Sequence, residues 1–185
     1  RYLSQALTAL GHRVTVVSGP PYPQLVDGVT LVKLPSLDLY ARESMVVPLS
    51  ELRDPLQRRE WMSKLTGGFA EPWTFGERAR EWLLAHSEEF DVVHDNQTLA
   101  DGILDIQRSG MPVVTTIHHP ITRDRRVALS EEPRWWWRLL IHRWHRFLSM
   151  QARVASQLNH VVTVSQLSAA DITTDFGVMP SAIKV

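Results

Sequence analysis

The chain has 185 residues, and its 20 Lys and Arg are balanced by 20 Asp and Glu, so its formal net charge is zero. Zero net charge argues against a nucleic-acid-binding protein, because phosphate neutralisation needs an excess of basic residues. Cysteine is absent, which excludes disulfide frameworks, thiolate metal sites and cysteine nucleophiles. No stretch approaches the ~20 apolar residues that a membrane-spanning helix needs.

Taken in chain order, the sequence alternates short apolar runs with amphipathic stretches. The expected helices are residues 1–10, 56–65, 72–86, 98–108, 133–158 and 168–176. The expected strands are residues 14–18, 29–34, 91–94, 113–117, 161–164 and the start of another at 183–185, with a loop over 118–132. Strands that alternate with helices predict an α/β fold with an open doubly wound parallel sheet. Such sheets bind ligands at the carboxyl ends of their strands.

Polar side chains follow the strand expected at 91–94. Five polar residues, His94, Asp95, Asn96, Gln97 and Thr98, come in succession after an apolar run, in positions suited to hydrogen-bonding a polyhydroxylated or phosphorylated ligand. Asp95 or Asn96 is equally able to cap the helix that follows, by accepting a backbone N–H bond. This segment is therefore a candidate binding site.

A denser polar cluster follows the strand expected at 113–117. It contains His118, His119, Thr122, Arg125 and Arg126. Histidine can exchange hydrogen bonds with a sugar hydroxyl, and arginine can bind phosphate. A structural histidine beside a solvated basic loop would give the same pattern. Adjacent histidines without a nearby third ligand do not fit zinc, so no metal is expected.

Ser165 follows the strand expected at 161–164 and precedes a helix, which favours helix capping. The backbone N–H groups of the same turn are also able to meet an anion, so Ser165 is a further candidate binding residue. A Gly-rich dinucleotide or phosphate loop is not found in the sequence.

The helix expected over 134–158 combines tryptophan with arginine: four of the seven Trp lie between Trp135 and Trp144. A basic amphipathic helix with interfacial Trp is suited to an anionic membrane surface. A crossover helix packed on the sheet with a solvated basic back would explain the apolar residues near Leu158 better. Trp135 and Trp136 fall outside the apolar stripe, so they are the expected contact with lipid or a partner.

Four segments carry a resemblance to a known family: RYLSQALTALGHRVTVVSG, FDVVHDNQTLADGI, GMPVVTTIHHPITRDRR and VVTVSQLSAADITTDFGV. Their order and spacing resemble the N-terminal domain of the family 4 retaining glycosyltransferases, which have the GT-B fold of two facing Rossmann-like domains. The resemblance implies transfer of a sugar from a nucleotide-diphosphate donor to an acceptor, with retention of configuration and no metal.

The resemblance also suggests residue roles. His118 matches the family's histidine that reaches the transferred sugar and the reacting centre. The stretch Asp95 to Thr98 and the loop with His119, Thr122, Arg125 and Arg126 would line the pocket for a glycan, lipid-linked or small-molecule acceptor.

The same resemblance implies that residues 1–185 are a single acceptor-side domain, a fragment without the family's first strand and without its donor-binding C-terminal domain, and inactive alone. We expect a cytoplasmic protein, associated with the inner face of the membrane if the Trp-rich helix contacts lipid. Two alternatives stay open: a non-catalytic α/β module that docks through that helix, and a nucleotide-sugar epimerase with the GT-B fold.

Overall fold

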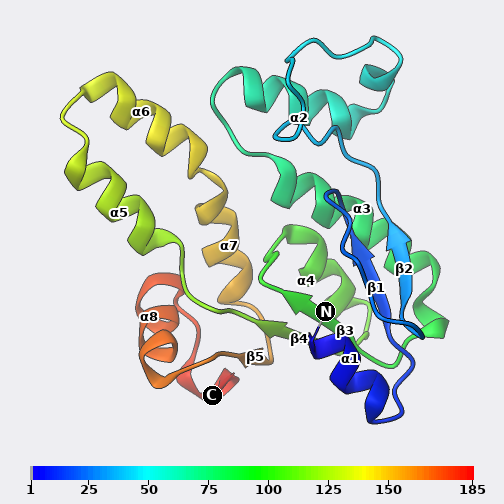
Figure 1. Ribbon diagram of the computed structural model, residues 1–185. Coiled ribbons are helices and arrows are strands. Elements are labelled where there is room, and N and C mark those ends of the chain that lie inside the picture. Colours follow the sequence, from blue (N-terminus) through cyan, green and yellow to red (C-terminus); the bar gives the residue numbers. More distant parts are fainter. Residues whose placement is uncertain (1) are drawn as a thin grey trace. The chain divides into compact units, whose positions relative to one another are not determined.

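The computed structural model describes residues 2–185, and its helices and strands alternate largely in the predicted order (Figure 1). The chain forms two compact units, one ending at Trp61 and the other covering Met62–Val185. All strand pairs are parallel, and the strands of the described residues form two separate sheets. The predicted α/β class with parallel strands is confirmed.

The first unit contains one strand pair and a small core of its own. It comprises α1 (Tyr2–Ala9), β1 (Thr15–Ser18), β2 (Thr30–Lys33), a 3-10 turn at Glu51–Arg53 and most of α2 (Pro55–Leu65). β1 and β2 pair in parallel, with Thr15 opposite Thr30. Leu37, Leu39 and Val47 form the small core, and the buried carboxylate of Glu60 accepts a hydrogen bond from the backbone of Leu37 at 2.9 Å. This contact fixes the irregular segment after β2 against α2.

The second unit is built on a four-stranded parallel sheet with the order β3-β4-β5-β6. Its strands are β3 (Val93–Asn96), β4 (Val113–Thr116), β5 (Val161–Val162) and β6 (Ile183–Lys184). Its helices are α3 (Glu71–Ala85), α4 (Asp101–Arg108), α5 (Thr122–Glu131), α6 (Trp135–Trp144), α7 (Phe147–Ala155) and α8 (Gln166–Phe176), with 3-10 turns at Ser87–Glu89 and Pro180–Ala182.

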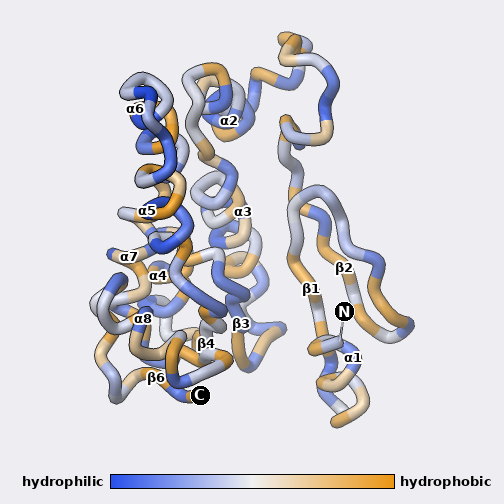
Figure 2. The backbone as a smooth tube through the Cα atoms, turned by 60° about the vertical axis from the view of Figure 1, so that its left-hand side comes forward, coloured by the Kyte–Doolittle hydropathy of each residue, from blue (hydrophilic) through white to orange (hydrophobic). Residues whose placement is uncertain are grey.

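The core of this unit lies between the sheet and helices α4, α7 and α8. It includes Ile103 and Ile106 from α4, Val154 from α7 and Ile172 from α8, all at most 4% exposed. Figure 2 shows the apolar stretches of the strands in orange, β4 among them. Burying these side chains holds the strands in register, and it thereby fixes the positions of the loops at their carboxyl ends.

The segment 118–158 differs from the prediction of a loop followed by one long helix. Thr122–Glu131 is helical, although few of its residues are apolar, and it is tied to α8 by ion pairs from Arg123 to Asp171 and from Arg126 to Asp175. The helix expected over 133–158 breaks between Trp144 and Phe147. At the break the His145 ring contacts the Ile141 carbonyl at 2.8 Å, and Phe69 stacks on Trp144.

The other boundaries shift by a few residues. The strand expected at 91–94 begins at Val93 and continues to Asn96, because His94, Asp95 and Asn96 pair in register with β4. The helix expected from 98 begins at Asp101. The polar residues predicted to follow this strand therefore belong partly to the strand itself.

Helices α3 and α4 approach closely at two glycines. A Cβ atom on Gly76 would lie 2.2 Å from the Cβ of Ala100, and one on Gly102 would lie 2.4 Å from the carbonyl oxygen of Gly76. Both distances are too short for non-bonded atoms. The two backbones can therefore approach this closely only because neither residue has a side chain.

This contact predicts that Gly102→Ala lowers the free energy of unfolding by about 1–3 kcal/mol, because the methyl group would push against backbone. In an ordinary helix the same change stabilises by about 1 kcal/mol. Urea unfolding followed by circular dichroism measures the effect. Glu81→Ala, at an exposed position of α3, is the matched control and should change little. A stabilised Gly102→Ala variant would contradict the close packing.

Candidate active site

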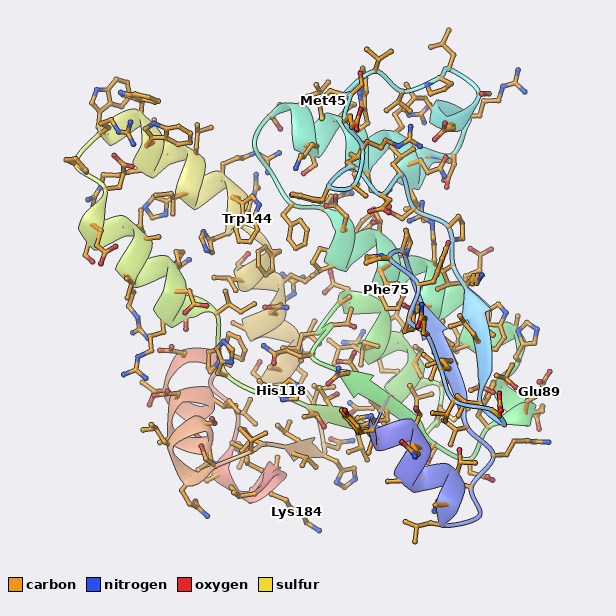
Figure 3. The ribbon with its side chains drawn as sticks, viewed as in Figure 1. Met45, Phe75, Glu89, His118, Trp144 and Lys184 are labelled. Atoms are coloured by element: carbon orange, nitrogen blue, oxygen red, sulfur yellow. The ribbon has the colours of Figure 1, made fainter. Side chains whose placement is uncertain are left out.

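The polar residues predicted at the strand ends meet at the carboxyl edge of the four-stranded sheet. β3 and β4 are parallel, with Asp95 opposite Thr115 and Asn96 opposite Thr116, so the residues that follow the two strands lie next to each other. His118, labelled in Figure 3, lies where the chain leaves β4 toward α5. The contacts of this edge converge on it.

His118 is held from two sides by the end of β3. Its Nε2 atom lies 2.9 Å from Oδ1 of Asn96, and its backbone N–H donates to Oε1 of Gln97 at 2.7 Å. Nε2 of Gln97 also donates to the carbonyl of His119, at 2.7 Å. The His118 side chain remains exposed, so a ligand can reach its imidazole.

A buried carboxylate organises the turn between β3 and α4. Asp95 is 5% exposed, and its two oxygens accept hydrogen bonds from the backbone N–H groups of Thr98 and Leu99, at 3.1 and 3.2 Å. Burial raises the pKa of Asp95, while these hydrogen bonds act in the opposite direction. The carboxylate thus stabilises a turn in front of α4, whose N-cap is Ala100.

The same turn contains left-handed backbone at two residues that are not glycine. The φ angle is 60° at Gln97 and 52° at Leu99. Gln151 of α7, which is 3% exposed, supports the turn by donating from Nε2 to the carbonyls of Thr98 at 3.3 Å and Gln97 at 3.5 Å. Strained backbone of this kind persists only where surrounding contacts over-determine it, and it clusters at functional sites.

Two residues of this edge were missed by the sequence-based prediction. Thr116 places its hydroxyl 2.8 Å from Nε2 of His94. Gln151 is the polar member of an otherwise apolar helix face, and that interruption was the available signal. The hydrogen bonds of both residues hold the site in place, and neither residue supplies a reactive group.

The basic segment after β4 divides into paired and unpaired groups. Thr122 donates to Asp175, and Arg126 pairs with the same carboxylate at 2.7 Å. His119 lies 3.9 Å from Asp124, and both side chains are mostly exposed. Within residues 2–185, no carboxylate lies within ion-pair distance of the half-buried Arg125. The cationic group left to meet a ligand is therefore Arg125, and the exposed His119 ring is a further polar group beside it.

Ser165 caps α8, as its position in the sequence favoured. Its hydroxyl oxygen accepts a hydrogen bond from the backbone N–H of Ser168 at 3.1 Å. Over residues 2–185, no cluster of three or more His, Asp or Glu side chains is arranged to hold a metal ion. None of the helices in the same range is both long and apolar enough to span a membrane.

The raised pKa of Asp95 predicts a pH-dependent stability. The folded protein holds the Asp95 proton more tightly than the unfolded chain, so the stability linked to this group is fully present below its ordinary value of 3.8. That stability is lost as pH rises through the raised pKa. As pH rises above 3.8, the free energy of unfolding of the wild type should therefore fall relative to that of Asp95→Asn.

Urea unfolding of both proteins at a series of pH values measures this difference. The value at the lowest pH gives the part of the difference that comes from the changed hydrogen bonds and does not depend on pH. Other carboxylates, such as Glu132 with its pKa lowered to about 2 by Arg134, cancel in the comparison. A difference that is flat with pH, or that moves toward the wild type, would show that Asp95 is not the buried, disfavoured charge described above.

The comparison with known proteins agrees with this architecture. The family model described as Glycosyltransferase Family 4 matches residues 1–185. The chain is 47% identical, over 188 residues, to the MMP alpha-(1->4)-mannosyltransferase of Mycolicibacterium hassiacum. That alignment covers 100% of this chain and 46% of the relative, so the chain spans about half of the relative's length. The match of this family model to the whole chain shows that the chain belongs to glycosyltransferase family 4.

Proposed function

We propose that this chain is the acceptor-side domain of a two-domain GT-B glycosyltransferase that transfers a mannosyl group from a nucleotide-diphosphate donor, with retention of configuration. The observation that carries the proposal is the exposed His118 imidazole, held at the carboxyl edge of a parallel sheet in a family 4 chain. Mannose as the sugar and α-(1→4) as the linkage are taken from the name of the relative.

In the proposed reaction the bond between the sugar's anomeric carbon and the diphosphate oxygen breaks, and the acceptor oxygen forms the new glycosidic bond. The acceptor's hydroxyl proton passes to the departing phosphate, so no nucleophile from the protein is needed. His118 would exchange a hydrogen bond with a hydroxyl of the transferred sugar and so orient it. A second domain would supply the groups that bind the diphosphate, where charge develops.

The acceptor pocket is proposed to include the turn from Asp95 to Thr98, which the buried Asp95 carboxylate stabilises, and the loop from His119 to Arg126. Arg125 has no carboxylate partner among the described residues, and the His119 side chain is exposed. Thr122 and Arg126 are anchored to Asp175, so they would shape the wall by fixing the first turn of α5. Ser165 would contribute to ligand binding indirectly, by capping the N-terminus of α8, whose backbone N–H groups are able to meet an anion.

His118→Ala in the complete enzyme should reduce mannosyl transfer about 10²- to 10³-fold, the usual effect of removing one hydrogen-bonding group from a reacting centre. Product formation from a nucleotide-diphosphate mannose is the measurement. His160→Ala, at an exposed histidine before β5, is the matched control and should keep full activity. Normal transfer by the His118→Ala enzyme would overturn the proposed role.

We also propose that α6 gives the protein a peripheral membrane contact. No residue of α6, all of which the structure describes, is buried, and Trp135 is 71% exposed. The Arg134 guanidinium lies 5.3 Å from the ring centroids of Trp136 and Trp137. Exposed indoles beside arginine suit the interface of an anionic bilayer. The contact is limited to α6, because α7 is packed in the core.

Sedimentation with vesicles rich in phosphatidylglycerol should carry the protein into the pellet, and Trp135→Ala/Trp136→Ala should remove most of that binding. Phosphatidylcholine vesicles should bind weakly, because they offer no charge to the arginines. Leu167→Ala, at an exposed apolar residue of α8, is the control and should bind as the wild type does. Equal sedimentation with and without vesicles would exclude the membrane contact.

A further inference from the structure

Contacts between β3 and the segment after β4 follow a diagonal pattern. In the parallel register, His94 lies opposite Val114 and Asn96 lies opposite Thr116. The side-chain hydrogen bonds join residues two positions further along the chain, His94 to Thr116 and Asn96 to His118. Residues two apart on a strand share a face, so His94 and Asn96 project together while Asp95 points to the other side. The position of Asn96 on β3 therefore places its side chain against the His118 ring.

Gln97 adds a contact to the backbone of the same segment. Its Oε1 accepts from the N–H of His118 and its Nε2 donates to the carbonyl of His119, both at 2.7 Å. One partner only donates and the other only accepts, so a single orientation of the amide satisfies both. Two short hydrogen bonds from one side chain fix the position and the direction of the chain at His118.

The left-handed backbone at Gln97 directs its side chain across to that segment. The conformation is sterically unfavourable for a residue with a Cβ atom, yet it is held by the buried Asp95 carboxylate and by Gln151. These supports are buried, whereas the His118 side chain is exposed. The buried polar groups thus serve the placement of His118.

The contact from Asn96 also selects the form of the imidazole. In this orientation of the Asn96 side chain its Oδ1 faces Nε2 at 2.9 Å, and since an amide oxygen can only accept, the proton of this hydrogen bond lies on Nε2. In a neutral imidazole the remaining lone pair is then on Nδ1. His118 is thereby prepared as a hydrogen-bond acceptor through Nδ1.

We infer that Asn96 and Gln97 are positioning residues for His118: Gln97 fixes its peptide, and Asn96 holds its ring as the Nε2–H tautomer so that Nδ1 accepts from a hydroxyl of the sugar. The part that concerns the sugar rests on the proposed function, and the part that concerns His118 does not. The two amides thus act on the reaction through His118.

The tautomer is tested by nitrogen-15 and carbon-13 NMR of the complete protein with labelled histidine, with the His118 signals assigned by their loss in His118→Gln. The wild type should show the Nε2–H pattern, and Asn96→Ala should show a mixture of tautomers. Asn159→Ala, at an exposed asparagine before β5, should leave the pattern unchanged. An Nδ1–H tautomer in the wild type, or no change in Asn96→Ala, would overturn the role of Asn96.

Hydrogen exchange of the His118 amide tests Gln97. Exchange should be at least about tenfold faster in Gln97→Ala, whereas Gln97→Glu keeps the accepting oxygen and should retain protection at His118. Gln166→Ala, at an exposed glutamine of α8, is the control. Exchange at the wild-type rate in Gln97→Ala would overturn the role of Gln97.

Kinetics then connect this placement to the reaction. For Gln97→Ala we expect kcat to fall on the order of 10²-fold while the donor KM stays unchanged, because misplaced catalytic groups reduce the rate more than binding. A change confined to KM would overturn the positioning role. A wild-type protein that transfers no sugar, but shows the Nε2–H tautomer and the protected amide, would refute the proposed function and leave the positioning of His118 intact.

Discussion

The buried carboxylate of Asp95 is the constraint on which the site depends. Its oxygens accept hydrogen bonds from the N–H groups of Thr98 and Leu99, in place of backbone carbonyls. This arrangement costs free energy, because burial disfavours the charged form of the carboxyl group. With Thr98 and Leu99 fixed, the chain can hold left-handed backbone at Gln97. The direction of the Gln97 side chain follows from that conformation, and the position of His118 follows from Gln97. The buried Asp95 carboxyl group thus contributes, through this turn, to the placement of an exposed histidine.

The apolar core supplies the frame for this arrangement. Ile103 and Ile106 of α4 pack with Val154 of α7, and Gln151 lies on α7 one turn before Val154. Helix α7 therefore both fills the core and positions the Gln151 amide that supports the turn after β3. Because α3 and α4 meet at glycines, α4 is held close to its neighbour as well as to the sheet. Packing errors in these helices would displace the turn, and with it the histidine.

Much of the fold could be predicted from the sequence, because apolar periodicity marks every element that contributes to the core. The helix α5 could not, since it is stabilised by ion pairs from Arg123 and Arg126 to α8 rather than by an apolar face. The break before Phe147 was hidden for the opposite reason, since the apolar stripe continues across it while burial begins only after it. Apolar periodicity in the sequence shows which residues are apolar, but it does not show which of them are buried in the core.

The candidate site shows a similar division. The positions of His118, Asn96 and Gln97 at the strand ends could be predicted from the alternation of strands and helices. Their separate roles depend on the register of β3 against β4 and on one φ angle, and neither can be deduced from residue type. A polar run after a strand therefore predicts where a ligand binds more reliably than which side chain contacts it. In this chain Gln97 uses both of its amide atoms within the protein, and Oδ1 of Asn96 faces His118. We therefore propose that groups without such a partner, such as Arg125 farther along the same loop, contribute to acceptor recognition.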